Sequence, residues 1–383
     1  MRNGMRIVDA DAHVIEPHTL WHDYLDPSLR DRAPRAVGLT FGFEFETFSV
    51  NLPGQWLPGG SPEDVALMSE RIQATYQELF PQAYAQGFAA PAQLVDMDRE
   101  GVDVAFLYPS FGLFALASDD IDPVLAVGIA RAYNNWLADF CKQDPARLRG
   151  VAMLPLQDPQ GAAAEADRCA TDLGFRGAFV RPNPVGGRNF DDPAYDRLWE
   201  VMSHHSMALG IHEGGFPRLP QVVGGRLVHP EQVHICTHPM EQMISAVSII
   251  YGGLLERFPG LRVAFLEAGC GWVPFWLHRM DEHWENSTRR NFGVHHVLTQ
   301  PPSEYFRRQC YVSADANEYM LPQVIELIGD DHIVFTTDYP HPDSPWPHAA
   351  EEFLAIAGVS DESKAKILWD NALTLYGEAV NVG

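Results

Sequence analysis

The side chains best suited to chemistry near the start of the chain are Asp11 and His13, in the stretch from Ile7 to Pro17. The stretch begins with apolar residues, as a buried strand does, and the two polar residues stand two positions apart. On a strand this spacing places both side chains on one face. A carboxylate and an imidazole that point the same way can hold a metal ion. A solvated turn after a first strand would have the same pattern, so the two interpretations stay open at this point.

The elements that would position such residues follow from the apolar pattern. Eight short apolar runs, near residues 7, 104, 152, 179, 210, 264, 312 and 335, alternate with helical patterns. Continuous apolar strands separated by helices are typical of a parallel sheet that is buried on both faces. Three Asp-Pro pairs predict helix starts, because Asp caps the amino end and Pro fits the first turn. These pairs are Asp122-Pro123, Asp158-Pro159 and Asp192-Pro193. Eight such units predict an α/β fold, a (β/α)8 TIM barrel.

Two long irregular insertions interrupt this rhythm, at about 27–91 after the first strand and at about 287–306 before the seventh. In the first, Phe41, Phe43 and Phe45 alternate with other residues, which predicts a short strand or hairpin. An insertion of this length is typical of a lid, a binding loop or an oligomer contact, and a structural flap over the barrel fits equally well. We expect residues 1–383 to form a single domain around the barrel.

Composition excludes several classes of partner. The 383 residues are 46% hydrophobic, and 27 basic and 51 acidic residues give a formal net charge of -24. Such a surface repels nucleic acid and anionic lipid. No apolar run reaches the roughly 18 residues of a membrane span, and the first residues do not resemble a signal peptide. The five cysteines are odd in number and contain no C-x-x-C pair, which predicts a reducing cytoplasm rather than a disulfide framework.

In a barrel of this type the functional side chains lie at the carboxyl ends of the strands. The predicted strand ends carry several polar residues: Asp11, His13, Arg181, His212, Glu213, Glu267, Asp338 and His341. Burying so many acidic groups together would be costly without a cation. We therefore predict a divalent metal. Mixed oxygen and nitrogen ligands favour zinc or manganese and also suit iron, with one ion or two.

The same residues resemble a known family. Asp-x-His on the first strand, His on the fifth and Asp on the eighth are similar to the amidohydrolase superfamily. The branch it most resembles is the amidohydrolase-related one that includes aminocarboxymuconate-semialdehyde decarboxylase and γ-resorcylate decarboxylase. Residues 252–261, 337–341 and 371–377 support the resemblance. It runs nearly end to end and is weakest over the two insertions. These motifs are specific for the family and not for a substrate.

The resemblance implies metal ligation by Asp11, His13, His212 and Asp338, and a homodimer. The sixth strand departs from the pattern, because known decarboxylases have His-x-Gly-Gly where this chain has Glu267-Ala-Gly. Glu267 is then a candidate base or metal ligand.

His238 is the other candidate replacement for the missing imidazole. It stands just before Pro239, where we expect a helix over 239–257 to begin. The positive end of that helix would favour a neutral imidazole there. A simple cap residue is the alternative.

Three functions are compatible with these residues. The first is metal-dependent hydrolysis or non-oxidative decarboxylation of a small carboxylated or aromatic substrate. The ion would lower the pKa of bound water, Asp338 would accept its proton, and Arg181 would hold a substrate carboxylate. The second is a dinuclear iron or manganese oxygenase that adds Glu267 and His238 to the ligand set. The third is a non-catalytic partner subunit of a hetero-oligomer.

Overall fold

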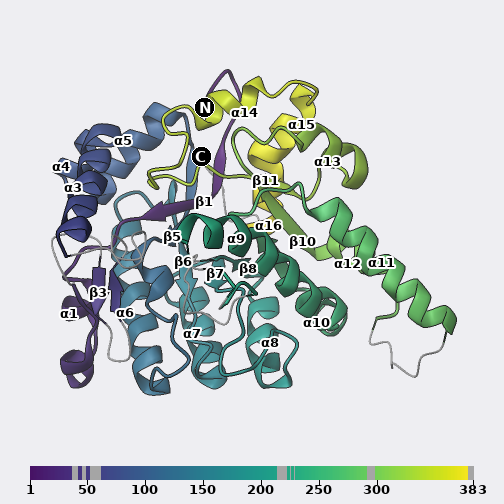
Figure 1. Cartoon of the computed structure of the whole chain (residues 1–383), viewed down its shortest axis with the longest axis horizontal. Helices are drawn as coiled ribbons and strands as arrows, with labels where there is room; N and C mark the ends of the chain where they lie inside the picture. The colour runs from purple at the N-terminus through teal and green to yellow at the C-terminus, as the bar shows by residue number, and fades with distance from the viewer. Residues whose placement is uncertain are drawn as a thin grey trace.

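An eight-stranded parallel sheet curves into a nearly closed barrel, with helices around its outside (Figure 1). The structure is a computed structural model that describes residues 1–36, 42–44, 49–51, 62–213, 222–224, 226–227, 229–290 and 298–377. The strands of the sheet, in spatial order, are β1 (Val8–Val14), β5 (Val104–Pro109), β6 (Leu148–Met153), β7 (Gly177–Val180), β8 (Ala208–Ile211), β9 (Arg262–Phe265), β10 (Cys310–Ala314) and β11 (Ile333–Phe335). The predicted TIM barrel and its eight strand positions are confirmed.

The strands form where the sequence is continuously apolar, because both faces of the sheet are covered. Every residue of β1, β5 and β7 is buried, including the polar residues of β1. Helices follow the strands along the chain, and the main ones are α6 (Pro123–Cys141), α7 (Pro159–Thr171), α8 (Asp196–His204), α9 (Pro230–Ala246), α11 (Val273–Arg290), α12 (Pro302–Gln309), α13 (Leu321–Ile328) and α14 (Ala349–Ala355).

The predicted Asp-Pro helix starts are also confirmed. Asp122 accepts a hydrogen bond from Leu125 N at 3.1 Å and thereby caps α6. Asp158 caps α7 in the same way, through Gln160 N at 3.1 Å. Asp192 caps η3 (Pro193–Tyr195), a short 3-10 helix that continues into α8. Each carboxylate satisfies an amide that the helix itself leaves without a partner.

The floor of the barrel is closed by the last helix, α16 (Asn371–Tyr376). The Tyr376 ring stacks on Phe106 with centroids 3.5 Å apart. Its hydroxyl donates to Ala10 O at 2.8 Å and lies 2.9 Å from the Tyr108 hydroxyl. The barrel interior is therefore filled below the strand ends, and any binding must take place at the carboxyl ends.

The first insertion is more regular than its sequence predicts. It contains η1 (Pro27–Arg32), a small antiparallel sheet of β2 (Arg35–Ala36), β3 (Gly42–Glu44) and β4 (Ser49–Asn51), and the helices α3 (Pro62–Leu79) and α4 (Pro81–Ala85). Phe43 lies on β3 as expected, whereas Phe41 and Phe45 fall outside the described residues.

The prediction that the insertion at about 27–91 is irregular is wrong where α3 and α4 form. The reason is a contact with a distant part of the chain. Phe80, which follows α3, packs against Tyr339 and Trp346 from the loop after β11, with ring centroids 5.4 and 4.8 Å apart. These contacts join segments that are far apart in the chain, so no local pattern reveals them.

Both ends of the second insertion are helical, since α11 reaches Arg290 and α12 begins at Pro302. Residues 291–297 lie outside the described part. The remaining elements are α1 (Leu20–Tyr24), α5 (Ala90–Glu100), η2 (Phe111–Phe114), η4 (Val247–Tyr251), α10 (Leu254–Arg257), α15 (Asp361–Ala365) and η5 (Lys366–Asp370). Among the described residues, no helix combines the length and apolar character needed to cross a membrane. All five cysteines are free.

Candidate metal centre

Four predicted ligands meet at the carboxyl ends of the strands. Asp11 and His13 lie on β1, His212 follows β8, and Asp338 comes three residues after β11. His13 Nε2 lies 3.8 Å from Asp11 Oδ1 and 3.4 Å from Asp338 Oδ1. His212 Nε2 lies 3.5 Å from the same Asp11 oxygen. The barrel thus brings together side chains that are more than 300 positions apart in the chain.

Among the described residues, the atoms that face the centre of this cluster have no partner outside the cluster. Several buried side-chain atoms make no hydrogen bond within the described part of the chain, and five of them belong to this cluster: Asp11 Oδ1, His13 Nε2, His212 Nε2, Glu267 Oε2 and Asp338 Oδ1. Buried polar atoms in native proteins nearly always have a partner, because leaving one without costs about 1–3 kcal/mol. Oxygen and imidazole nitrogen atoms directed at a common point are the ligands that a divalent cation takes. The donor set therefore fits a metal ion.

The two buried imidazoles are held for ligation by backbone carbonyls. His13 Nδ1 lies 2.7 Å from Pro109 O, and His212 Nδ1 lies 3.1 Å from Glu213 O. A carbonyl can only accept, so Nδ1 carries the proton in each ring and Nε2 keeps its lone pair for the cluster. Burial lowers the pKa of both rings well below the usual value. Both are neutral, as a metal ligand must be.

The carboxylates show the opposite electrostatic effect. Burial raises the pKa of Asp11 well above its usual value, and the nearby charges of Glu267 and Asp338 raise it further. The pKa of Glu267 is raised by the same two causes, removal from water and the charge of Asp338. Like charges this close cannot all ionise without a cation between them. A divalent ion would remove this repulsion.

An unusual backbone conformation directs two of these carboxylates toward the cluster. Glu267 and Asp338 have φ values of 52° and 56°, in the left-handed region that non-glycine residues seldom adopt. Each is held there by a hydroxyl: Ser313 Oγ accepts from Glu267 N at 3.1 Å, and Thr336 Oγ1 accepts from Asp338 N at 3.1 Å. Residues kept in costly conformations cluster at functional sites. The turn after β9 and the turn after β11 both fit that description.

His238 joins the cluster from a helix rather than from a helix start. We expected it to cap a helix over 239–257, and this is wrong because α9 begins at Pro230 and contains Pro239. A proline leaves the carbonyl four residues earlier without a helical partner. That carbonyl belongs to Ile235, which is 71% exposed, so water can satisfy it. The dipole argument for a neutral His238 does not apply.

His238 nevertheless faces the site, because Gln242 ties α9 to the barrel one turn further on. Gln242 Nε2 donates to Ile211 O at 2.8 Å and to Leu266 O at 2.9 Å, which joins the helix to the ends of β8 and β9. His238 Nε2 then lies 3.4 Å from Glu267 Oε2, and His212 Nε2 lies 3.2 Å from the same oxygen. Burial lowers the pKa of His238, against the opposing charge of Glu213.

His341 also belongs to the cluster, as its place after the eighth predicted strand indicated. Its Nδ1 lies 2.7 Å from Asp338 Oδ1, and its Nε2 lies 3.0 Å from Ser110 Oγ. Burial alone would lower its pKa, but the Asp338 and Glu267 carboxylates outweigh burial and raise that pKa to about 9. His13, Asp338 and His341 form one possible set of metal ligands, and Asp11, His13 and His212 form another.

Other contributors have little or no signal in the sequence. Gln93 Nε2 on α5 donates to His13 O at 3.1 Å, and Tyr339 O accepts from His13 N at 2.6 Å. Such contacts are decided by packing. Asp315 follows β10 and adds negative charge that raises the pKa of Asp11 and Glu267. Its position just after the seventh strand could have identified it, since that is where functional residues of a barrel lie.

Arg181 lies on a different wall of the barrel mouth. Its guanidinium pairs with Asp119 and donates to the carbonyls of Ala117 and Pro184, the latter at 2.9 Å. Among the described residues it contacts no member of the cluster. The predicted role of Arg181 in holding a substrate carboxylate stays a prediction, and it would require some of these bonds to be exchanged.

The match to known proteins agrees with this geometry. Residues 8–377 match the amidohydrolase family. The chain belongs to the amidohydrolase family. It is 32% identical over 269 residues to a γ-resorcylate decarboxylase of Rhodococcus jostii, an alignment that covers 66% of this chain and 77% of that one.

Two solved structures share the fold. A 5-carboxyvanillate decarboxylase from Sphingomonas paucimobilis superposes with a TM-score of 0.64 at 28% identity, over 74% of this chain and 82% of that one. A 5-carboxyvanillate decarboxylase from Novosphingobium aromaticivorans, solved with manganese, superposes with a TM-score of 0.67 at 20% identity, over 98% and 97% of the two chains. The resemblance inferred from the sequence is thus confirmed, and this amidohydrolase is a metal-dependent enzyme. These relatives give no support to a non-catalytic subunit.

Proposed function

We propose that this amidohydrolase is a carbon–carbon lyase, a divalent metal-dependent non-oxidative decarboxylase of a small aromatic carboxylate. The observation that carries the proposal is a set of five ligand-type atoms at the barrel mouth that face one another and, among the described residues, have no partner outside their cluster. The relatives at 28% and 32% identity act on aromatic carboxylates, as their names state. Hydrolysis uses a similar centre, but no relative reported above has that activity.

The metal would be held by Asp11, His13, His212 and Asp338, with Glu267 as a further candidate ligand. Once bound, the ion would supply positive charge that binds the substrate's carboxylate or phenolic oxygen and stabilises negative charge that develops on the substrate. Manganese and zinc suit the mixed oxygen and nitrogen donors, and manganese is the first to test because it is present in a solved protein of this fold.

The proton that replaces carbon dioxide on the ring would come from Glu267 and His238. Their Oε2 and Nε2 atoms are 3.4 Å apart, so the two side chains can share one proton between them. Such a pair suits general acid catalysis, which contributes about 10²–10⁴-fold to a rate. In this proposal the pair replaces the imidazole that other decarboxylases carry on the sixth strand. Asp338, next to His341, would act as ligand and as an alternative proton acceptor.

The test is release of carbon dioxide from 2,6-dihydroxybenzoate and related benzoates by protein freed of metal and reloaded with manganese, zinc or iron. We expect turnover only in reloaded protein and at the same rate without oxygen. Glu267→Gln should lower turnover about 100-fold, because the amide cannot donate the proton as an acid does. Its manganese content, measured by elemental analysis, should fall by no more than one ion per chain. Equal turnover by metal-free protein would contradict the proposal.

A dinuclear iron or manganese oxygenase is the second candidate, and one observation favours it. Glu267 Oε2 lies within 3.4 Å of both His212 Nε2 and His238 Nε2, so ligand-type atoms extend beyond the four that the family resemblance implies. Two ions per chain, together with oxygen consumption coupled to substrate loss, would favour this candidate. Undiminished turnover under anaerobic conditions would eliminate it.

Assembly and location are part of the proposal as well. The family resemblance implies a homodimer, and five free cysteines without a disulfide suit a reducing cytoplasm. Sedimentation equilibrium of the metal-loaded protein measures the first point. Localisation of the tagged full chain measures the second.

A further inference from the structure

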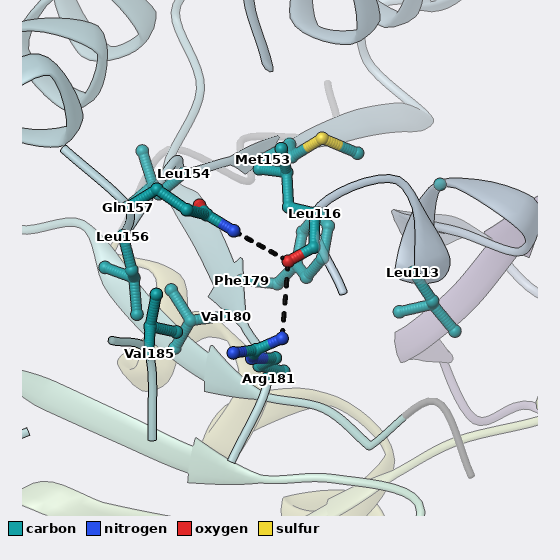
Figure 2. Close-up of a pocket in the computed structure, with 11 residues that line it drawn as sticks. Leu113, Leu116, Met153, Leu154, Leu156, Gln157, Phe179, Val180, Arg181 and Val185 are labelled. Atoms are coloured by element: carbon teal, nitrogen blue, oxygen red, sulfur yellow. Dashed lines mark hydrogen bonds between the residues drawn. The ribbon is translucent and has the colours of Figure 1, made fainter. Parts of the chain in front are cut away.

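A small pocket lies on the wall of the barrel mouth opposite Glu267 and Asp338. It is formed at the carboxyl ends of β5, β6 and β7, and the sheet order places these three strands across the barrel from β9, β10 and β11. Most of its lining is apolar, as Figure 2 shows, and includes Leu113, Leu116, Met153, Leu156, Phe179 and Val185. Its volume is about 30 Å³.

Two successive contacts between aromatic rings connect the pocket with the candidate metal ligand His212. The Phe179 ring lies 6.1 Å from that of Tyr108, and the Tyr108 ring stacks near His212 at 5.6 Å. Both strand ends open on the same face of the barrel, which is the catalytic face in this fold. The pocket and the candidate metal ligands therefore lie at the same end of the barrel.

The wall of the pocket is fixed by two hydrogen bonds to one carbonyl. Gln157 Nε2 donates to Leu116 O at 2.9 Å, and Arg181 Nη1 donates to it at 3.4 Å (Figure 2). Both bonds go to the backbone, so the side chain of Leu116 can be changed without removing them. A fixed apolar wall discriminates between substituents by size, because it cannot close around a smaller group.

The chemistry of the lining indicates what fits. A volume of about 30 Å³ holds about two water-sized groups and is too small for a second ring. A carboxylate would be costly there, because leucine, methionine and phenylalanine side chains cannot solvate it. The terminal nitrogens of Arg181 cannot compensate, since they already bond Asp119 and carbonyls of the chain itself.

We propose that this pocket selects substrates with a methyl- or methoxy-sized apolar substituent on the aromatic ring, a specificity that rests on the proposed decarboxylase function. The substituent packs against Leu116, Met153 and Phe179 while the carboxylate lies at the metal centre. Unsubstituted rings leave the pocket to poorly bonded water, and groups larger than methoxy are excluded by its size.

The experiment compares 2-hydroxybenzoate with its ring-methylated and ring-methoxylated derivatives on manganese-loaded protein. For at least one ring position, the substituted compound should have a kcat/KM about tenfold above that of 2-hydroxybenzoate, the usual effect of one methyl group in an apolar pocket. Leu116→Phe fills the pocket and should abolish this preference, so that the substituted and unsubstituted compounds have equal kcat/KM. The matched control is Leu327→Phe on α13, where the side chain is 64% exposed and touches nothing of the site.

A pocket-enlarging variant keeps the test informative if Leu116→Phe does not fold. Val185→Ala should extend the preference to ethyl and ethoxy groups, because it removes two methyl groups from the lining. Equal kcat/KM for all substituents in the natural protein would overturn the inference. So would a preference that neither variant changes.

Binding measurements separate this inference from the proposed function. Calorimetry with the same benzoates on metal-loaded protein needs no turnover. If no benzoate is decarboxylated but methylated ones bind more tightly, and Leu116→Phe removes the difference, the function fails and the pocket assignment stands. If the benzoates are decarboxylated without any substituent preference in rate or binding, the pocket assignment fails and the function stands. Absence of both turnover and binding overturns both.

Discussion

Two walls of the barrel mouth carry buried charged residues, and the hydrogen-bond partners of these residues differ between the walls. On the wall of β1, β8, β9 and β11, the inward-facing atoms of Asp11, His13, His212, Glu267 and Asp338 have no partner outside their own cluster in the described part of the chain. On the opposite wall, Glu16 accepts from Phe111 N at 2.9 Å and Gly112 N at 2.8 Å, and Arg181 is paired with Asp119. Glu16 and Arg181 are also buried, but the terminal atoms of their side chains are hydrogen-bonded within the chain.

The difference shows that burial alone does not distinguish a ligand-binding residue from a structural one. The hydrogen-bond partners of its polar atoms do. A buried charge with protein partners at its terminal atoms stabilises local structure, as Glu16 does at the start of η2. A buried polar group whose outer atom has no hydrogen-bond partner lowers the stability of the folded protein, and a bound ligand can offset this loss. By this criterion the metal centre lies on the first wall. Arg181, a candidate by its place at a strand end, has partners at its terminal nitrogens as Glu16 has at its oxygens, and its predicted role in holding a substrate carboxylate stays a prediction.

The strongest test of this comparison removes one imidazole from the cluster and, as a control, one from the exposed surface. His212→Ala should lower bound metal to well below one ion per chain and turnover by more than about 100-fold, since even outer partners of metal ligands matter 10–100-fold. Elemental analysis and the carbon dioxide assay measure the two effects. The control is His348→Ala, whose side chain is 64% exposed and should leave both unchanged. Full metal content in His212→Ala would refute the assignment of the cluster.

Replacing Arg181 tests the structural side of the comparison. Arg181→Gln should lower the free energy of unfolding by about 2–4 kcal/mol, because it leaves the carbonyls of Ala117 and Pro184 and the carboxylate of Asp119 short of a donor. Urea unfolding measures this loss, and metal content should not change. A raised KM with unaltered stability would instead support the sequence-based prediction that Arg181 holds a substrate carboxylate.

Glu16 gives an effect of similar size to that of Arg181, but one that appears as a pH dependence of stability. Burial raises its pKa from 4.5 to about 7, despite hydrogen bonds from Gly112 N and Phe111 N. Between these values the unfolded chain loses the proton and the folded chain keeps it, so stability falls as pH rises through this window. The full difference amounts to about 3 kcal/mol above pH 7.

Glu16→Gln removes this contribution while Asp9, whose pKa is also raised to about 7, remains in both proteins. The stability of the natural protein relative to the variant should therefore decline by about 3 kcal/mol between pH 4.5 and pH 8. Urea unfolding at several pH values in this range measures the difference. Parallel curves for the two proteins would show that the Glu16 carboxyl ionises normally in the folded state.

Local patterns were enough to predict the barrel, its strand positions and the Asp-Pro helix starts. These features depend on short-range rules: continuous apolar runs for strands buried on both faces, and a carboxylate before proline for a cap. The strand-end rule of the barrel then led to Asp11, His13, His212, Glu267 and Asp338. The helical content of the first insertion was missed because Phe80 gains its contacts from Tyr339 and Trp346, far along the chain.

The sequence by itself determined which residue types stand at the strand ends, because the period of the barrel fixes those positions. Tertiary structure alone decided which of them act together. His238 reaches Glu267 only because Gln242 ties α9 to two strand ends, and His341 meets Asp338 and Ser110 across the barrel mouth. Arg181 is drawn away from the cluster by Asp119. Hydrogen bonds between distant segments leave no periodic trace in the chain, so only the folded structure separates the residues of the site from those that support it.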